Sequence, residues 1–277
     1  MQTSAVKHIK ITRVNEKGIL ETNDQLAVEE PLEIQMMYGS AGNKTIKIIS
    51  VTMRTPGNDE ELATGFLFTE GIINNKNQVI KIQPDKADGN KVMVILSDTT
   101  VPHLQTVERN FYTTSSCGVC GKSGIDAIKT VSMYAQQEDT MKVSASVFYS
   151  LPIALKKQQE LFASTGGLHA SSLFDVDGDL LLLREDVGRH NALDKVIGAC
   201  FFNNHLPLDN TILLLSGRAS FELIQKASMA GIKIIASIGA PSSLALQVAE
   251  EFGITLIGFL GKENFNIYSA SHRVVFG

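Results

Sequence analysis

The hydrophobic and polar positions of the chain change their pattern near residue 140. Before it, short β-branched runs broken by Asn, Asp, Gly and Pro predict antiparallel strands at 6–14, 25–29, 32–38 and 45–54. A helix is expected to begin after Asn58, with Glu61 at the capping-box position, and to end at Gly71. Strands follow at 79–82 and 92–96. These elements predict a small α+β N-terminal domain.

Beyond the polar stretch at 135–140, helices and strands alternate. Strands are expected at 180–183, 211–215, 232–238 and 254–260, with helices between the last three, which predicts a largely parallel central sheet. Asn191 is expected to cap a helix whose apolar stripe carries Cys200 into the core. We therefore predict an α/β protein with two domains, 1–140 and 141–277.

Ligands of such sheets bind beyond the carboxyl ends of the strands. The loops 216–220, 239–243 and 261–266 fall there, and Ser220 and Ser242 precede helices whose first N–H groups bind anions. Arg218 and Lys262 add positive charge at the same edge. Ordinary turn chemistry accounts for the Ser and Gly residues of each loop taken singly. Their convergence favours an anion site.

The segment 115–122 holds two of the three cysteines, Cys117 and Cys120, spaced as C-x-x-C among small residues. Lys122 and the helix predicted at 123–129 favour a thiolate, which is the reactive form of cysteine. Half of a zinc site, a dithiol redox pair and chance are the alternatives. A structural zinc normally needs four ligands, and no second pair at zinc-binding spacing is present in the sequence.

Two histidines precede or begin predicted elements near this edge. His190 lies in the densest charged cluster, 184–191, next to Arg189, and His169 follows two glycines. For each of them, a hydrogen-bonded histidine at a helix start explains the position as well as a functional role does.

Composition narrows the class of protein. The chain has 277 residues, 44% of them hydrophobic, and a net charge of −4, which favours a globular protein without the basic excess of nucleic-acid binders. The N-terminus lacks the apolar core of a signal peptide, and no apolar run is long enough to span a membrane. We expect a soluble, cytoplasmic protein that binds neither nucleic acid nor membrane.

Five motifs, at 115–122, 164–170, 185–195, 216–222 and 239–243, resemble those of the formate dehydrogenase accessory sulfurtransferase family (FdhD). The resemblance implies a small N-terminal domain, a cytidine-deaminase-like α/β domain and a homodimer. It also implies transfer of sulfur from a cysteine desulfurase to the molybdenum cofactor, bis(molybdopterin guanine dinucleotide), before the cofactor enters formate dehydrogenase. Cys117 would bear the persulfide, with Cys120 beside it. The cofactor site would include Phe259, Leu260, Gly261, Lys262, Glu263 and Asn264.

The sequence therefore predicts a sulfurtransferase with a persulfide on Cys117 and a cofactor site that also includes Arg218, Ser220, Ser242 and His190. GDP is expected to bind as a fragment of the cofactor. The alternative is a non-catalytic cofactor-binding chaperone whose C-x-x-C holds structural zinc. Zinc deaminase activity is disfavoured, because His169-Ala170-Ser171 lacks the glutamate of the H-x-E motif.

Overall fold

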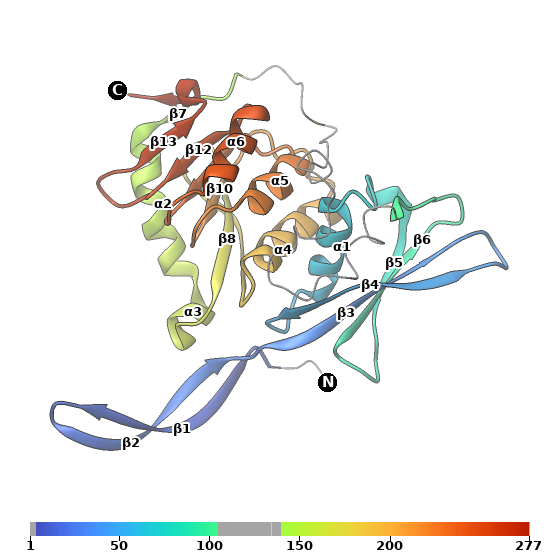
Figure 1. Cartoon of the computed structure of the whole chain (residues 1–277), viewed down its shortest axis with the longest axis horizontal. Helices are drawn as coiled ribbons and strands as arrows, with labels where there is room; N and C mark the ends of the chain where they lie inside the picture. The colour runs from blue at the N-terminus through green and yellow to red at the C-terminus, as the bar shows by residue number, and fades with distance from the viewer. Residues whose placement is uncertain (1–3, 105–133, 135–139, 277) are drawn as a thin grey trace.

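The computed structural model describes residues 4–104, 134 and 140–276. These residues form a two-stranded arm, a four-stranded sheet and a six-stranded sheet, with helices on the two larger sheets (Figure 1). The predicted α/β class is confirmed. The domain division at residue 140 stays a prediction, since residues 135–139 lie outside the described residues.

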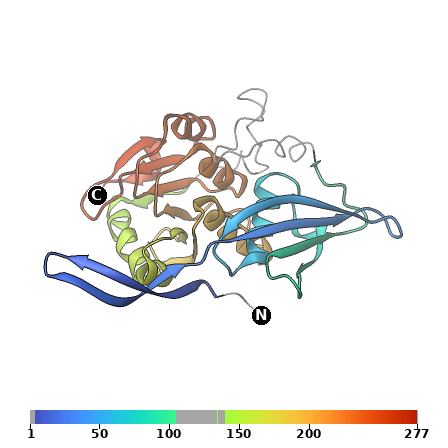
Figure 2. The same cartoon turned by 60° about the horizontal axis from the view of Figure 1, so that its bottom comes forward.

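The arm is an antiparallel hairpin whose turn projects beyond the body of the molecule (Figures 1 and 2), while β2 contacts the helix α3 (Glu160–Thr165). It consists of β1 (Val6–Asn15) and β2 (Gly18–Ala27), which pair over their whole length. The sequence placed the second strand at 25–29, which is too late in the chain. Residues 18–24 are polar in part, but they complete the ladder opposite β1.

The four-stranded sheet has the order β4-β3-β6-β5, with β3 and β6 parallel and the other pairs antiparallel. Buried residues of β3 and β6 line the face that α1 covers. The bounds are β3 (Glu30–Tyr38), β4 (Thr45–Arg54), α1 (Asp59–Thr69), the 3-10 turn η1 (Lys76–Gln78), β5 (Val79–Pro84) and β6 (Lys91–Leu96).

The six-stranded sheet has the order β13-β12-β11-β10-β8-β9 and carries helices on both faces. Leu213 and Ile235 point into one core with α4, α5 and α6, while Leu214 and Ile234 point into the other with α2. The strands are β8 (His169–Phe174), β9 (Leu180–Asp186), β10 (Ile212–Leu215), β11 (Ile234–Ser237), β12 (Thr255–Gly258) and β13 (Asn266–Ser269). The helices are α2 (Ala145–Gln158), α3 (Glu160–Thr165), α4 (Arg189–Phe202), α5 (Phe221–Met229) and α6 (Ser243–Glu251).

The remaining elements bring the segment before α2 next to the C-terminal residues of the chain. The short strand β7 (Val143–Ser144), which precedes α2, pairs in parallel with β14 (Val274–Val275) after the 3-10 turn η5 (Ser271–Arg273).

The sheet is mixed, and this refines the expected parallel arrangement. The central strands β10, β11 and β12 are parallel, as the alternation of strands and helices predicts. The strands β8, β9 and β13 join through antiparallel pairs. The sequence missed β8 because it carries two serines, Ser171 and Ser172, which are nevertheless buried. His169 therefore begins a strand and not a helix.

The two larger sheets are joined where α1 crosses α4. A Cβ atom at Gly65 would lie 2.9 Å from the Gly198 nitrogen and would collide with the Asp194 carbonyl oxygen. A Cβ atom at Gly198 would likewise collide with the Glu61 carbonyl oxygen. The backbones of the two helices are therefore in contact, and buried apolar residues of both sheets form one cluster around them.

Buried charges flank this crossing. Lys226 of α5 donates to Asp194 of α4, with the Nζ atom 3.0 Å from Oδ2, and it reaches Glu70 at 3.3 Å. Burial alone would lower the pKa of Lys226, but the two carboxylates raise it. The lysine therefore stays charged inside the protein, and Thr69 of α1 donates to the same aspartate.

Three predicted helix caps differ from the structure. Asn58 precedes α1 but makes no side-chain cap hydrogen bond, and Glu61 pairs with Arg184 in place of a capping box. Gly188, not Asn191, precedes α4, because Asn191 is one turn inside and bonds to β4. Ser220, which the sequence places as the cap of α5, makes no side-chain cap bond, whereas Ser242 caps α6.

The helix crossing yields a prediction about stability. Gly198→Ala forces α1 and α4 apart, and we expect a loss of roughly 3 kcal/mol in the free energy of unfolding, as for an overpacked core. Gly167→Ala is the matched control, since its Cβ atom would meet nothing closer than 3.9 Å. Urea unfolding of both variants measures the difference. Equal stability of the two variants would contradict the close crossing.

Candidate functional site

The carboxyl ends of β10, β11 and β12 meet at one edge of the six-stranded sheet, and the predicted anion-binding loops follow them. The antiparallel pairing of β8 brings His169 to this edge, and β9 ends there and leads into α4. The helices α5 and α6 begin at the same edge. Helix N-termini and cationic side chains are therefore collected in one place, as the sequence indicates.

Main-chain hydrogen bonds tie the three loops together. Gly239 N donates to Gly217 O at 3.0 Å, and Phe259 N donates to Gly239 O at 3.1 Å. The first loop is also tied to β8, because Ser216 N donates to Ala170 O at 3.0 Å. The rim of the site is thus a continuous backbone structure from β8 to the segment after β12.

One glycine allows this close approach of the loops. A Cβ atom at Gly258 would lie 2.6 Å from Pro241 Cδ and 3.0 Å from the Tyr268 ring. Any side chain there would push the second and third loops apart.

The predicted cofactor-binding residues after β12 lie on this rim. Phe259 is 52% exposed and has a left-handed backbone, with φ of 53°. Leu260 is buried and Gly261 is half-buried, while Lys262, Glu263 and Asn264 are exposed. The segment therefore offers one ring and one cation to solvent. Binding by these residues stays a prediction.

The other predicted residues lie on neighbouring parts of the rim. Arg218 is exposed, and its side chain passes Gly239. Ser242 Oγ accepts a hydrogen bond from Ala245 N at 3.2 Å, so this side chain caps the N-terminus of α6. The first two loops are held together by Ala219 N, which donates to Ala240 O at 3.2 Å.

His190 stands between α4 and α5. Its Nε2 atom lies 3.4 Å from Ser220 Oγ and 3.8 Å from Glu222 Oε2. Burial alone would raise the pKa of Glu222, but contacts with His190, its own N–H and Ser220 lower it to about 2. Glu222 is therefore a carboxylate at neutral pH, and the histidine is held by an anion in the first turn of α5.

His169 lies at the other side of this cluster. A Cβ atom at Gly217 would come 3.3 Å from its Nδ1 atom, so the ring lies against the first loop. Burial and the nearby Arg189 and His190 lower the pKa of His169. The ring is therefore neutral at pH 7 and can accept or donate a hydrogen bond at the edge.

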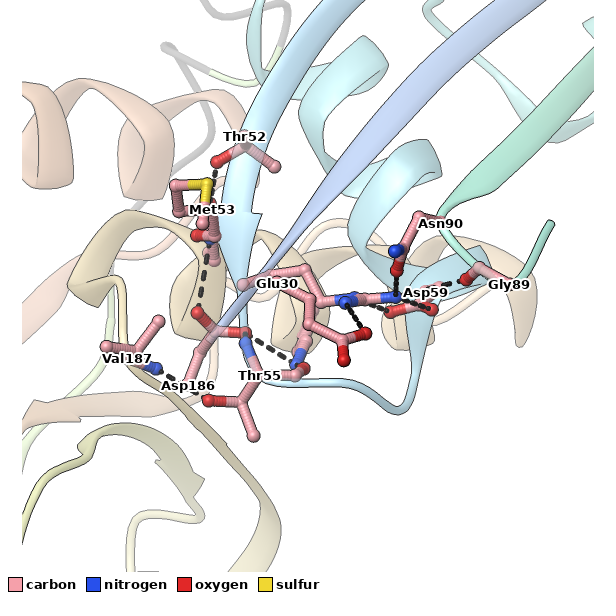
Figure 3. A network of polar contacts seen from close by, with 12 residues as sticks. Glu30, Thr52, Met53, Thr55, Asp59, Gly89, Asn90, Asp186 and Val187 are labelled. Atoms are coloured by element: carbon pink, nitrogen blue, oxygen red, sulfur yellow. Dashed lines mark hydrogen bonds and ion pairs between the residues drawn. The ribbon is translucent and has the colours of Figure 1, made fainter. Parts of the chain in front are cut away.

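Behind the edge, a buried polar network joins the start of α4 to the end of β4 (Figure 3). Asp186 accepts from Gly188 N at 2.8 Å and Thr55 N at 3.2 Å, and it pairs with Lys195 at 2.6 Å. Asn191 donates to Met53 O at 2.7 Å. Local sequence patterns do not indicate the bonds to Thr55 and Met53, because these residues lie 131 and 138 positions from Asp186 and Asn191.

Arg54 of β4 is the centre of the second half of this network, whose partners Glu30, Asp59 and Asn90 are labelled in Figure 3. The side chain is completely buried, and Nε lies 2.9 Å from Asp59 Oδ1. Its guanidinium also reaches Asn90 Oδ1 at 3.2 Å and Glu30 at 3.7 Å. These bonds hold the end of β4 against the start of α1.

The cysteines divide into two groups. Cys117 and Cys120 lie outside the described residues, so the structure does not test their predicted role. Cys200 is 5% exposed, and burial raises its pKa to about 11. The prediction that Cys200 belongs to the core is confirmed.

The described elements define an α/β protein with a hydrogen-bonding, partly cationic edge, and the sequence adds a C-x-x-C segment. The chain belongs to the FdhD/NarQ family, whose model matches residues 27–275. It is 46% identical over 273 residues to the sulfur carrier protein FdhD of Mycolicibacterium paratuberculosis, covering 96% of this chain and 97% of that protein. It is 43% identical over 280 residues to the protein of the same name from Mycobacterium bovis, covering 98% and 99%.

A crystal structure has the same fold. It is that of a formate dehydrogenase accessory protein from Desulfotalea psychrophila, with a TM-score of 0.73, 22% identity and coverage of 98% of this chain and 100% of the other. In the described ranges, each helix is too short or too polar to cross a lipid bilayer.

The environment of His169 generates a prediction about pH. Because its pKa is lowered in the folded protein, the unfolded chain binds more protons below about pH 6.5, and stability falls as the pH drops. His169→Gln removes this contribution, so the variant should lose less stability than the wild type between pH 7.5 and pH 5.5. Urea unfolding at both pH values measures it.

The exposed His205 supplies the control for this experiment. His205→Gln should retain the pH dependence of the wild type. If His169→Gln also retains the pH dependence of the wild type, the conclusion that His169 has a lowered pKa in the folded protein is wrong.

Proposed function

We propose that this protein is a sulfur carrier that bears a persulfide on Cys117 and delivers the sulfur to the molybdenum cofactor destined for formate dehydrogenase. The observation that carries the proposal is the near-full-length similarity to proteins named sulfur carrier protein FdhD. The C-x-x-C segment and the structural match to a formate dehydrogenase accessory protein support it.

The loading step is a thiol–persulfide exchange. The Cys117 thiolate attacks the terminal sulfur of the persulfide on a cysteine desulfurase, a sulfur–sulfur bond forms on Cys117, and the desulfurase cysteine leaves as a thiolate. Cys120 is close enough in sequence to attack the inner sulfur of this new persulfide. That attack forms a Cys117–Cys120 disulfide and releases the outer sulfur as sulfide, with the two thiols supplying both electrons.

The edge of the six-stranded sheet is the proposed site for the cargo, bis(molybdopterin guanine dinucleotide). Its pyrophosphates are anions, and the N-terminal N–H groups of α5 and α6 bind anions by their direction and dipole. Arg218 and Lys262 are exposed on loops of the same rim and can approach phosphate oxygens. His190, Ser220, Ser242 and the segment from Phe259 to Asn264 complete the proposed site. The homodimer implied by the resemblance also stays a prediction.

The sulfur-carrier proposal predicts a change in mass. After incubation with a cysteine desulfurase and cysteine, the protein should gain the mass of one sulfur atom, and Cys117→Ser should not. Cys120→Ser should retain the added sulfur longer, because it lacks the thiol that releases sulfide. Intact-mass spectrometry after different incubation times measures all three proteins.

Two outcomes contradict the persulfide mechanism. One is a Cys117→Ser protein that still activates formate dehydrogenase at the wild-type level. The other is stoichiometric zinc in the purified protein that is lost with either cysteine, which favours the cofactor-binding chaperone with a zinc-bound C-x-x-C.

The cargo site predicts binding of a guanine nucleotide. GDP should bind more tightly than ADP in calorimetry, as a fragment of the cofactor. Arg218→Ala combined with Lys262→Ala should weaken GDP binding at least about tenfold, which is about 1.4 kcal/mol, through the loss of two charge-assisted contacts.

The matched control removes two exposed lysines from β5 and the loop after it, Lys81→Ala with Lys86→Ala. This control changes the net charge equally and should bind GDP as the wild type does. If both double variants bind GDP equally weakly, Arg218 and Lys262 act only through long-range electrostatic attraction and do not contact the nucleotide. If the wild type does not bind GDP, the proposed cargo site is wrong.

A further inference from the structure

Arg189 is a half-buried cation without a counter-charge in the part of the chain that the structure describes. It is the first residue of α4, and no described residue forms an ion pair or a hydrogen bond with its side chain. The buried Arg54 and the half-buried Arg184, in contrast, each pair with a carboxylate. Removing a charge from water costs free energy unless the charge is paired. The position of Arg189 therefore favours a bound anion.

His169 lies beside this cation and also lacks a hydrogen-bond partner among the described residues. It is the first residue of β8, and the ladder places it opposite Asp186, three positions before Arg189. Its ring is half-buried and lies against Gly217, and no described residue forms a hydrogen bond with it. Polar groups that are removed from water are usually hydrogen-bonded. Two polar side chains that could bind a ligand are therefore neighbours at this end of the rim.

The electrostatic potential around these two side chains is positive. Asp186, the carboxylate that acts on His169, is already paired with a buried lysine at 2.6 Å. His190 faces Glu222 at 3.8 Å. Burial, Arg189 and His190 lower the pKa of His169, and together they outweigh Asp186, which raises it. The guanidinium of Arg189 is thus the cation that no carboxylate balances here, and an anion would supply the missing charge.

The backbone on both sides of Arg189 is fixed before a ligand binds. Asp186 accepts a hydrogen bond from Gly188 N at 2.8 Å, and Asn191 donates to Met53 O at 2.7 Å. A site whose shape is set in advance loses less free energy when it binds a ligand. The guanidinium therefore projects from a rigid part of the edge.

We propose that Arg189 and His169 form an anion subsite that binds a pyrophosphate group of the cargo. The planar guanidinium can donate two parallel hydrogen bonds to phosphate oxygens, and the imidazole N–H can donate another. The subsite lies where β8 begins, whereas Lys262 follows β12. These strands are three positions apart in the sheet, which is about 14 Å at the usual strand spacing. The subsite therefore adds a contact that Lys262 does not supply.

The identity of the anion rests on the proposed function, because the cargo named there carries pyrophosphate. The subsite itself does not rest on it, since the two side chains require only an anion of suitable shape. Inorganic pyrophosphate and GDP are therefore used as separate probes.

Calorimetry with inorganic pyrophosphate tests Arg189. Arg189→Gln keeps a polar side chain without the charge, and it should raise the dissociation constant for pyrophosphate at least about tenfold. The matched control is Arg13→Gln on the exposed surface of the arm, which removes the same charge and should bind pyrophosphate as the wild type does. Thermal unfolding shows whether Arg189→Gln is folded. We expect little loss of stability, since no described residue loses a partner.

The pH dependence of sulfate binding tests His169. A bound anion favours the imidazolium form, so binding should take up a proton and become tighter as the pH falls. Sulfate keeps its charge between pH 7.5 and pH 5.5, and the affinity of the wild type should rise at least about threefold over this range. The rise should be smaller in His169→Gln, in which Arg189, His190 and Asp186 remain. The exposed His205 again supplies the control, and His205→Gln should retain the full rise.

Four results would overturn the inference. The wild type could bind neither pyrophosphate nor sulfate, or Arg189→Gln could bind pyrophosphate as tightly as the wild type does. Equal weakening by Arg189→Gln and Arg13→Gln would show long-range attraction without a contact. A full pH dependence in His169→Gln would remove His169 from the subsite.

GDP separates this inference from the proposed function. If Arg218→Ala with Lys262→Ala weakens GDP binding and Arg189→Gln weakens binding of neither GDP nor pyrophosphate, the proposed cargo site holds and the subsite is wrong. If pyrophosphate binding depends on Arg189 but GDP does not bind, the anion subsite holds and the proposed guanine-nucleotide cargo is wrong.

Discussion

Two glycines set the distance between the two larger sheets. Because neither Gly65 nor Gly198 has a side chain, α1 and α4 touch through their backbones. The ion pairs around the crossing then have little freedom: Asp194 with Lys226, and Glu61 with Arg184. A displaced helix would leave Asp194 and Lys226 buried without each other, which costs several kcal/mol for a broken buried pair. Apolar packing brings the sheets together, and the charges select one arrangement.

The same arrangement positions the edge of the six-stranded sheet. The start of α4 is held from behind by Asp186 and Asn191, which bond to residues at the end of β4. His190 and Arg189 follow directly from this fixed point. The N-terminal sheet therefore acts on the candidate site through the start of α4, although no described residue of that sheet belongs to the rim. Disturbing the end of β4 is expected to move His190.

The sequence predicted those parts of the fold that depend on neighbouring residues. The strands β3 to β6 and β10 to β12 and the burial of Cys200 follow from local patterns. It failed where the partner is distant: β8 is a strand because β9 and β10 cover its serines, and Asn191 is a bridge to β4 and not a cap. The candidate residues of the edge were found because each follows a strand or begins a helix. Asp186 and Glu222 were missed, since their burial and partners arise only in the fold.

Backbone hydrogen bonds determine the shape of the rim, whereas the side chains that can contact a ligand lie outside this hydrogen-bonded frame. The loops are joined through N–H and C=O groups, from Gly217 to Gly239 and on to Phe259. Arg218, Lys262 and Asn264 project from this frame into solvent and carry little of its stability. Relatives can therefore exchange these side chains during evolution without rebuilding the loops. The preference for one anionic ligand over another can drift, or be redesigned, on an unchanged scaffold.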